Sequence, residues 1–245
     1  MDSSEIVEKA KKVGVRYFCN VGFDIKSSKK AIQQAAKYNE VYAAVGIHPN
    51  EAHKVNLLDV EEIDTLANGE KVVAIGEIGL DYYHDGTKYK EQQVALFEAQ
   101  LDVAKKHDLP VSLHIRDKDG KQDAYHDALE ILKNKKITKG IVHCYTQDPD
   151  LAAKFIKEGY YISIPGIVTF KGATDLQDTV KAISLNSMLL ETDAPYLTPD
   201  PMRGKLNTSE YIVYTAEYVA KLKNMDVADI VSATAINAKK IFNIK

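Results

Sequence analysis

The stretch VVAIGEIGLDYY, residues 72–83, decides the fold, because it places a carboxylate inside what is otherwise a buried strand. From Val72 to Leu80 the run is apolar apart from Glu77, and continuous apolar runs form strands covered on both faces of a parallel sheet. A carboxylate is almost never fully buried unless another group pairs with it. Glu77 therefore predicts a partner at this strand, and the rest of the sequence indicates which kind.

Further short apolar runs with many β-branched residues accompany this strand. The expected strands are 16–22, 41–47, 72–80, 110–115, 140–145, 160–164 and 188–192. The clearest helical period lies at 88–107, where one face carries Val94, Phe97, Leu101 and Ala104. Other helices are expected near 27–38, 58–68, 121–134, 149–158, 173–183, 208–223 and 226–242.

This alternation of strands and helices predicts an α/β fold with a parallel sheet. Seven strands, each followed by a helix, are one short of a TIM (β/α)8-type barrel. The chain also starts with a helical segment, SSEIVEKAKKVG (3–14), where a barrel starts with a strand. The alternative is an open doubly wound sheet, but the sequence has no glycine-rich phosphate loop of the Rossmann or P-loop type. We expect one barrel domain over residues 1–245 that lacks its first β-strand.

Composition excludes several classes of protein. The chain is 45% hydrophobic and 27% charged, as globular proteins are, and its net charge of −3 gives no general attraction to nucleic acid or anionic membranes. Its two cysteines are too few for a disulfide framework. No apolar run approaches the roughly 18 residues of a membrane span, and the start is no signal peptide. We expect a cytoplasmic protein without membrane attachment or an evident obligate protein partner.

Polar side chains recur at the ends of the expected strands, where barrels of this type carry their reaction site. Five of them, each on a different strand, are His48, Glu77, His114, His143 and Asp193. Each alone has a structural explanation, such as a hydrogen-bonded histidine or a turn aspartate. Together, imidazole nitrogens and carboxylate oxygens suit Zn²⁺, Mn²⁺ or related cations. The set predicts a metal site that activates water and stabilises charge on a phosphoryl group.

Other polar and aromatic residues support weaker expectations. Solvated surface positions are expected for His53, His84, His107 and His126, although His84 lies in the loop after Glu77. Three tyrosines follow strand ends and either stack on a base or line the barrel mouth, namely Tyr82, Tyr83 and Tyr145. Four cations are candidate phosphate contacts or ordinary surface charges, namely Arg116, Lys171, Arg203 and Lys205.

Seven segments together resemble the TatD family of metal-dependent hydrolases, in family order from about Val13 to the C-terminus. They are GIHPNEA (46–52), AIGEIGLDYY (74–83), LPVSLHIRD (109–117), GIVHCYTQ (140–147), YYISIPGIVTFK (160–171), LLETDAPYLTP (189–199) and RGKLN (203–207). The resemblance implies a barrel of the amidohydrolase type and one or two divalent metal ions (Mg²⁺, Mn²⁺ or Zn²⁺). It also implies hydrolysis of DNA phosphodiester bonds.

Carried over by position, the resemblance gives Glu77 the role of bridging carboxylate and makes His114 and His143 the imidazole ligands of one metal. Asp193 resembles the aspartate that binds metal and orients the attacking water. One departure is that many members begin with a strand carrying a His-x-His pair, and this chain shows no such segment. The sequence agrees with three explanations of this departure. The start is truncated or misassigned, a tail from another chain fills the position of the missing strand, or the protein is compromised.

Three functions follow from these observations. The leading one is a deoxyribonuclease acting on DNA ends or single strands, with Asp193 and Glu77 as catalytic residues. Its metal-activated water attacks the phosphodiester while Asp193 orients or deprotonates it, and the substrate contacts are His48, Arg116, Arg203 and Lys205. The second is an amidohydrolase acting on a small C–N or ester substrate, since fold does not determine substrate. Many such enzymes use a carbamylated lysine where Glu77 stands. The third is a catalytically compromised barrel.

Overall fold

A computed structural model of the protein describes residues 3–84 and 87–244. Contacts between residues divide the chain into two compact units. The five-stranded unit is Tyr17–Val142, and the two-stranded unit combines the chain up to Arg16 with the chain from His143 onward. Each unit is described by itself. Among the described helices, none is both long and apolar enough to cross a membrane.

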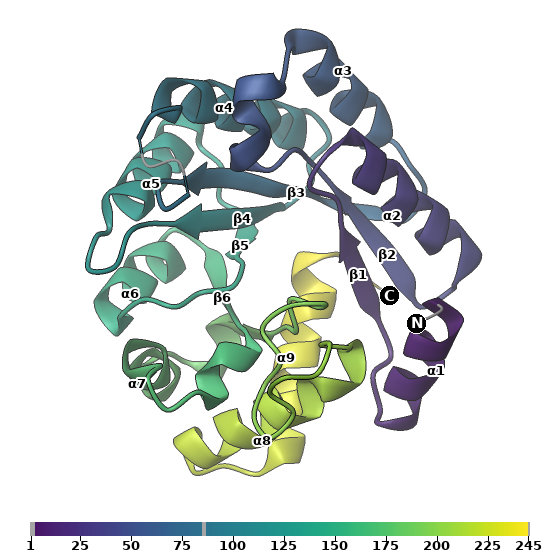
Figure 1. The fold of residues 1–245 in the computed structure, drawn as a ribbon, viewed down its shortest axis with the longest axis vertical. Helices are drawn as coiled ribbons and strands as arrows, with labels where there is room; N and C mark the ends of the chain where they lie inside the picture. The colour runs from purple at the N-terminus through teal and green to yellow at the C-terminus, as the bar shows by residue number, and fades with distance from the viewer. Residues whose placement is uncertain (1–2, 85–86, 245) are drawn as a thin grey trace. The chain divides into compact units, whose positions relative to one another are not determined.

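The five-stranded unit is a parallel sheet whose strands pair in chain order. Its strands are β1 Phe18–Val21, β2 Val41–Val45, β3 Val72–Asp81, β4 Val111–Arg116 and β5 Gly140–Val142. Its helices are α2 Ile25–Lys37, the 3-10 helix η1 Pro49–Lys54, α3 Leu57–Leu66, α4 Lys90–Lys106 and α5 Asp123–Lys135. The helices α2 to α5 line the outer side of these strands (Figure 1). Crossover helices of this kind bury a parallel sheet, as the apolar strands predicted.

Strand β3 is buried along its whole length except at Glu77, which is half-buried. The pairing of β3 with β4 shifts register between Ile75 and Ile78, so Glu77 lies at an irregularity of the sheet. Gly79 follows with φ +144°, and a Cβ built there would lie 2.0 Å from the main-chain oxygen of His114. Only glycine therefore allows β3 to approach β4 closely enough to bring Glu77 beside His114.

The buried face of α4 differs from the expected face at one position. Phe97, Leu101 and Ala104 are buried as predicted, but Val94 is half-buried and Gln93 is buried beside it at 1% exposure. The helical period identified the apolar stripe, but it does not predict a buried glutamine, because an amide is buried only where it finds hydrogen-bond partners.

Those partners are main-chain groups at the ends of two strands. The Gln93 side chain accepts the Asp81 N–H (2.8 Å) and donates to the Asp81 carbonyl (2.9 Å). Gln100, two turns along α4 and fully buried, accepts the Ile47 N–H (2.7 Å) and donates to the Ile47 carbonyl (3.0 Å). Helix α4 thus anchors the chain at the end of β3 and just before His48.

The two-stranded unit contains β6 Tyr160–Ile164 and β7 Met188–Leu190, which pair in parallel. Its α-helices are α1 Ser3–Lys12, α6 Pro149–Lys157, α7 Thr174–Ala182, α8 Ile212–Lys223 and α9 Val227–Ile241. Its 3-10 helices are η2 Gly166–Thr169, η3 Leu185–Ser187 and η4 Ser209–Tyr211. Asn237 of α9 donates to the carbonyls of Leu185 and Met188, which attaches that helix to the start of β7.

The described residues bear out the seven expected strands and a helix ahead of the first strand, with three corrections. The helix expected at 208–223 begins at Ile212, after the 3-10 turn of η4. The strand expected at 140–145 ends at Val142, and that expected at 188–192 ends at Leu190. Cys144 (φ +46°) and Asp193 (φ +53°) leave the extended conformation, so both strands stop before them. His143 accordingly follows its strand instead of lying within it.

Candidate metal centre

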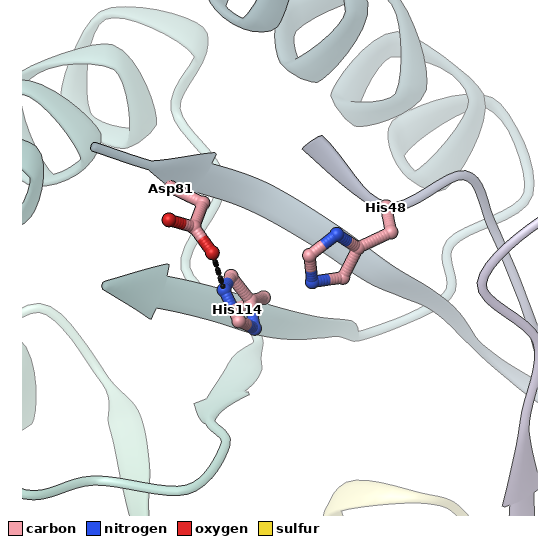
Figure 2. Close-up of side chains that lie close together, drawn as sticks. All are labelled: His48, Asp81 and His114. Atoms are coloured by element: carbon pink, nitrogen blue, oxygen red, sulfur yellow. Dashed lines mark hydrogen bonds and ion pairs between the residues drawn. The ribbon is translucent and has the colours of Figure 1, made fainter. Parts of the chain in front are cut away.

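Three side chains from separate segments of the five-stranded unit come together at the C-terminal ends of its strands (Figure 2). His48 caps η1 after β2, Asp81 ends β3, and His114 lies on β4. One ligand atom of each lies within 4.8 Å of the others. The rings of His48 and His114 meet edge to face, with 4.1 Å between their centroids. Imidazole nitrogens and a carboxylate oxygen at this spacing make the grouping a candidate metal centre.

Glu77 joins the same group. Its Oε1 lies 2.8 Å from His114 Nδ1 and 3.6 Å from His48 Nε2. The His48 ring is oriented by its other nitrogen, because Nδ1 accepts the backbone N–H of Asn50 at 3.1 Å. The structure therefore brings together Glu77, His114 and His48, all of which the sequence singled out.

Asp81 is a site residue that the sequence analysis missed. Its side chain is fully buried, and Oδ1 accepts the backbone N–H groups of Tyr83 (2.9 Å) and His84 (3.1 Å). Oδ2 lies 3.0 Å from His114 Nε2 and 2.7 Å from His84 Nδ1. The signal was present, since Asp81 directly follows the apolar run and ends its strand as the other candidates do.

Two pKa values are displaced by these contacts. Burial alone would raise the pKa of Asp81, but the hydrogen bond and charge of His114 and the bonds from His84 hold it well below its usual 3.8. Burial alone would lower the pKa of His114, but its hydrogen bonds to Asp81 and Glu77 raise it above 6.5. The two carboxylates thus favour positive charge on the His114 ring.

A second group lies in the two-stranded unit, after β5 and β7. His143, Cys144 and Asp193 each offer a ligand atom within 4.8 Å of the others. His143 Nε2 is 3.6 Å from Asp193 Oδ1, and its Nδ1 is 3.0 Å from Glu191 Oε2. The other oxygen of Glu191 accepts the Cys144 N–H at 3.0 Å. Sequence reasoning named His143 and Asp193 but missed Glu191, although it too stands at a strand end.

The backbone around this second group is held in an unusual conformation. Cys144 and Asp193 both have φ in the left-handed region, which costs of order 1–3 kcal/mol for each non-glycine residue. The Asp193 loop is fixed from the RGKLN segment, where buried Asn207 donates to the carbonyls of Thr192 (2.7 Å) and Tyr196 (2.5 Å). Such strain persists where surrounding contacts over-determine it, as they do at functional sites.

The expected phosphate contacts lie on the surface. The Arg116 guanidinium stacks 4.0 Å from the centroid of the Tyr83 ring, and the Arg203 guanidinium lies 3.9 Å from that of Phe170. Lys205 and Lys171 are exposed. Each guanidinium is thereby held against an aromatic face.

Several weaker expectations require correction. Tyr82 and Tyr145 are buried at 2% and 0% exposure, so neither can stack on a base, whereas Tyr83 is 42% exposed. His84 is exposed, but its ring contacts Asp81 instead of being merely solvated. His107 is half-buried, with Nε2 2.7 Å from Asp64 Oδ1. His53 and His126 are exposed as expected.

The donors in both groups fit a divalent cation. In the five-stranded unit two imidazoles face two carboxylates, Glu77 and Asp81, and in the two-stranded unit His143 faces Glu191 and Asp193. Carboxylates brought this close to imidazoles are stabilised by a cation that accepts nitrogen and oxygen ligands, as Zn²⁺ and Mn²⁺ do. The residues that would hold it are Glu77 and His114 in the five-stranded unit and His143 and Asp193 in the two-stranded unit, while Asp81 and Glu191 face the opposite nitrogens of the two imidazoles.

Comparisons with known proteins agree with this chemistry. The family described as TatD related DNase matches residues 1–243. The metal-dependent hydrolase YabD of Bacillus subtilis is 40% identical over 245 residues, covering 99% of this chain and 93% of YabD. The metal-dependent hydrolase YcfH of Escherichia coli is 35% identical over 246 residues, covering 99% of this chain and 89% of YcfH.

A solved structure is similar over the same length. The crystal structure of YJJV, a TatD homologue from Escherichia coli, has a TM-score of 0.91 and 28% identity, covering 100% of this chain and 93% of that chain. The expected fold class, an α/β fold of the TIM-barrel type with seven strands, is confirmed by this match. A family match over residues 1–243 and a relative 40% identical across 99% of the chain establish that this chain belongs to the TatD family of metal-dependent hydrolases.

Proposed function

We propose that the protein is a divalent-metal-dependent phosphodiester hydrolase, a deoxyribonuclease acting on DNA ends or single strands. The observation that carries the proposal is the position of Glu77, with Oε1 2.8 Å from His114 Nδ1 and 3.6 Å from His48 Nε2. A glutamate stands where many amidohydrolases that cleave C–N bonds carry a modified lysine. The family description, TatD related DNase, supports the same reaction.

The proposed roles divide among the named residues. A bound divalent cation would lower the pKa of water and stabilise negative charge on a phosphoryl oxygen. Glu77 and His114 are the proposed ligands in the five-stranded unit, and His143 and Asp193 are those in the two-stranded unit. Asp193 is also proposed to orient the attacking water and take its proton.

The proposed substrate contacts are three exposed cations and one half-buried histidine. Arg116 and Arg203 present guanidinium groups, which form paired hydrogen bonds with phosphate oxygens. Lys205 is exposed in the segment that holds the Asp193 loop, and it supplies a further positive charge. His48 is half-buried beside Glu77, where its Nε2 can reach a bound phosphate or the cation. The exposed ring of Tyr83 beneath Arg116 offers an apolar surface to an unpaired base.

Two substitutions test this function directly. Glu77→Ala and Asp193→Ala are expected to abolish cleavage of labelled single-stranded and blunt-ended oligonucleotides in Mg²⁺, Mn²⁺ or Zn²⁺, with circular dichroism unchanged. Asp178→Ala, at an exposed aspartate paired with Lys181 on α7, is the control and should keep full activity. Metal-stimulated cleavage that survives in both site variants would contradict the proposal.

The same preparations separate the two alternative functions. Turnover of cyclic amides or esters without cleavage of oligonucleotides would identify an amidohydrolase acting on small substrates. Elemental analysis after reconstitution measures the metal content of the chain. Metal below stoichiometric amounts together with no hydrolysis would identify a catalytically compromised barrel.

A further inference from the structure

We propose that Asp81 is a positioning residue of the metal centre, which accepts the Nε2–H of His114 and so presents Nδ1 of that ring as the metal-binding nitrogen. Asp81 itself is then not a ligand. This inference rests on the part of the proposed function that makes His114 a metal ligand. It is independent of whether DNA is the substrate.

The two nitrogens of His114 face different carboxylates. Nδ1 lies 2.8 Å from Glu77 Oε1, and Nε2 lies 3.0 Å from Asp81 Oδ2, so the ring bridges two carboxylates. A neutral imidazole carries a proton on one nitrogen and a lone pair on the other. A metal binds through the lone pair, and the N–H of the other nitrogen donates a hydrogen bond to the carboxylate on the opposite side. The metal-binding nitrogen of His114 therefore depends on which of the two carboxylates, Glu77 or Asp81, binds the same metal as the ring.

Hydrogen bonding separates the two carboxylates. Asp81 already receives two backbone N–H groups on Oδ1, from Tyr83 at 2.9 Å and His84 at 3.1 Å. Its Oδ2 faces the ring nitrogens of His114 and His84, with the Asn50 amide at 3.4 Å. The Asp81 carboxylate would have to give up several of these hydrogen bonds in order to coordinate a cation.

Solvent access points to the same assignment. The Asp81 side chain is 0% exposed, whereas the Glu77 side chain is 19% exposed. A metal that activates water needs an open coordination position for water and substrate. The cation therefore belongs on the Glu77 side of the ring, which is also the side where His48 Nε2 lies at 3.6 Å from Glu77.

Asp81 is also fixed in place by its surroundings. The buried side chain of Gln93 holds both the N–H and the carbonyl of Asp81, so the main chain at this position has little freedom. With backbone and carboxylate both held, the direction of the Nε2–H bond sets the plane and tautomer of the His114 ring before any metal binds. Carboxylate–histidine pairs of this kind orient metal ligands in proteins generally.

The wild-type protein provides the first test. Protein labelled with ¹⁵N-histidine and loaded with Zn²⁺ is measured by long-range proton–nitrogen correlation, and the His114 signals are assigned by their loss in His114→Gln. We expect the proton on Nε2 and the metal-induced shift on Nδ1. A proton on Nδ1 with the metal shift on Nε2 would overturn the proposal without any change in fold.

Substitutions provide the second test. In Asp81→Asn the amide N–H faces Nε2, which moves the ring proton to Nδ1, so Zn²⁺ affinity should fall by about 10–100-fold. Asp127→Asn is the matched control, because Asp127 accepts the Tyr82 hydroxyl at 2.8 Å in the same unit and should leave Zn²⁺ affinity unchanged. Affinity is measured by competition with a chromophoric chelator, and thermal unfolding checks the fold.

The outcomes distinguish this inference from the proposed function. Loss of Zn²⁺ affinity in His114→Gln but wild-type affinity in Asp81→Asn would overturn the positioning role alone. Wild-type affinity in His114→Gln would remove His114 from the ligand set and overturn both. If Asp81→Asn does not fold, the wild-type nitrogen spectrum still shows which nitrogen of His114 carries the proton and which binds the metal. Loss in both variants with His114 Nε2 protonated supports the proposal.

Discussion

Glu77 interrupts an apolar strand, yet its carboxylate has partners that offset its removal from water. Its Oε1 lies against imidazole nitrogens of His114 and His48, and 19% of its side chain remains exposed. Burial of a carboxylate is tolerated where charge and hydrogen bonding compensate for lost hydration. The residue that is fully buried is Asp81, and its compensation comes from main-chain N–H groups and two imidazoles.

Two buried tyrosines make the stability of the protein sensitive to alkali. Burial, with the hydrogen bond to Asp127, raises the pKa of Tyr82 well above 10, and burial likewise raises the pKa of Tyr160. Because the folded-state values exceed the unfolded value, their contribution is complete below pH 10 and is lost as pH rises beyond it. The free energy of unfolding should fall by up to about 1.4 kcal/mol per tyrosine for each pH unit above 10.

Absorbance at 295 nm, followed with circular dichroism, measures this effect. Tyr82 and Tyr160 should ionise only in step with unfolding, because burial raises the pKa of each phenol above its usual value. Tyr82→Phe should remove one ionisation from the late phase. Complete ionisation of every tyrosine in the folded protein would show the interpretation to be wrong.

At the scale of elements, the contact between β3 and β4 determines the geometry of the five-stranded unit's site. The register shift between Ile75 and Ile78 turns Glu77 toward β4, and Gly79 lets the two backbones approach. Helix α4 then fixes the strand ends through Gln93 and Gln100. The side chains that gather around His114 are therefore placed by backbone contacts between elements.

The Gly79→Ala variant tests the role of this close approach. Its φ of +144° and the 2.0 Å approach of a Cβ to the His114 main-chain oxygen combine strain with a clash against backbone. We expect a loss of roughly 2–4 kcal/mol in the free energy of unfolding, together with weaker metal binding, because β4 must move.

A control separates the clash from the strain. Gly120 also has positive φ (+73°), but a Cβ there meets nothing within 4 Å. Gly120→Ala should cost only about 1 kcal/mol and leave metal binding intact. Denaturant unfolding and chelator competition on both variants provide the measurements. Equal losses in the two variants would mean that the approach of β3 to β4 is unimportant.

At the scale of the whole molecule, the chain combines a five-stranded unit and a discontinuous two-stranded unit, each with its own group of strand-end ligands. A ligand that binds only the native state stabilises it by mass action, by about 2.7 kcal/mol at a concentration 100 times the dissociation constant. Metal binding should therefore be visible in the stability of the protein as well as in its activity.

Thermal unfolding with and without metal measures this stabilisation. Treatment with EDTA should lower the Tm and Zn²⁺ or Mn²⁺ should restore it, by roughly 2–4 °C for each kcal/mol of binding free energy in a chain of this size. Glu77→Ala should show a reduced response, and Asp178→Ala the full one. A Tm that is the same in EDTA and in metal would contradict a metal-binding native state.

Local sequence pattern predicted the strands and α-helices, but not the 3-10 helices or the early ends of β5 and β7. Hydrophobic period identifies strands and helices because it reflects which face each segment buries. The positions of His48 and His114 at strand ends also followed from sequence, because parallel strands present their C-terminal ends on one side. Buried Gln93 and Gln100 could not be predicted this way, because their partners lie 12 and 53 residues away in the chain.

The sequence by itself determined the order of strands and helices, the residue types of the candidate metal centre and the family. The tertiary structure alone decided that Asp81 and Glu191 belong to the site and which nitrogen of His114 faces which carboxylate. The physical reason is that these contacts depend on strand register and on backbone approach between segments 33 to 48 residues apart. Periodicity within a segment carries no information about either.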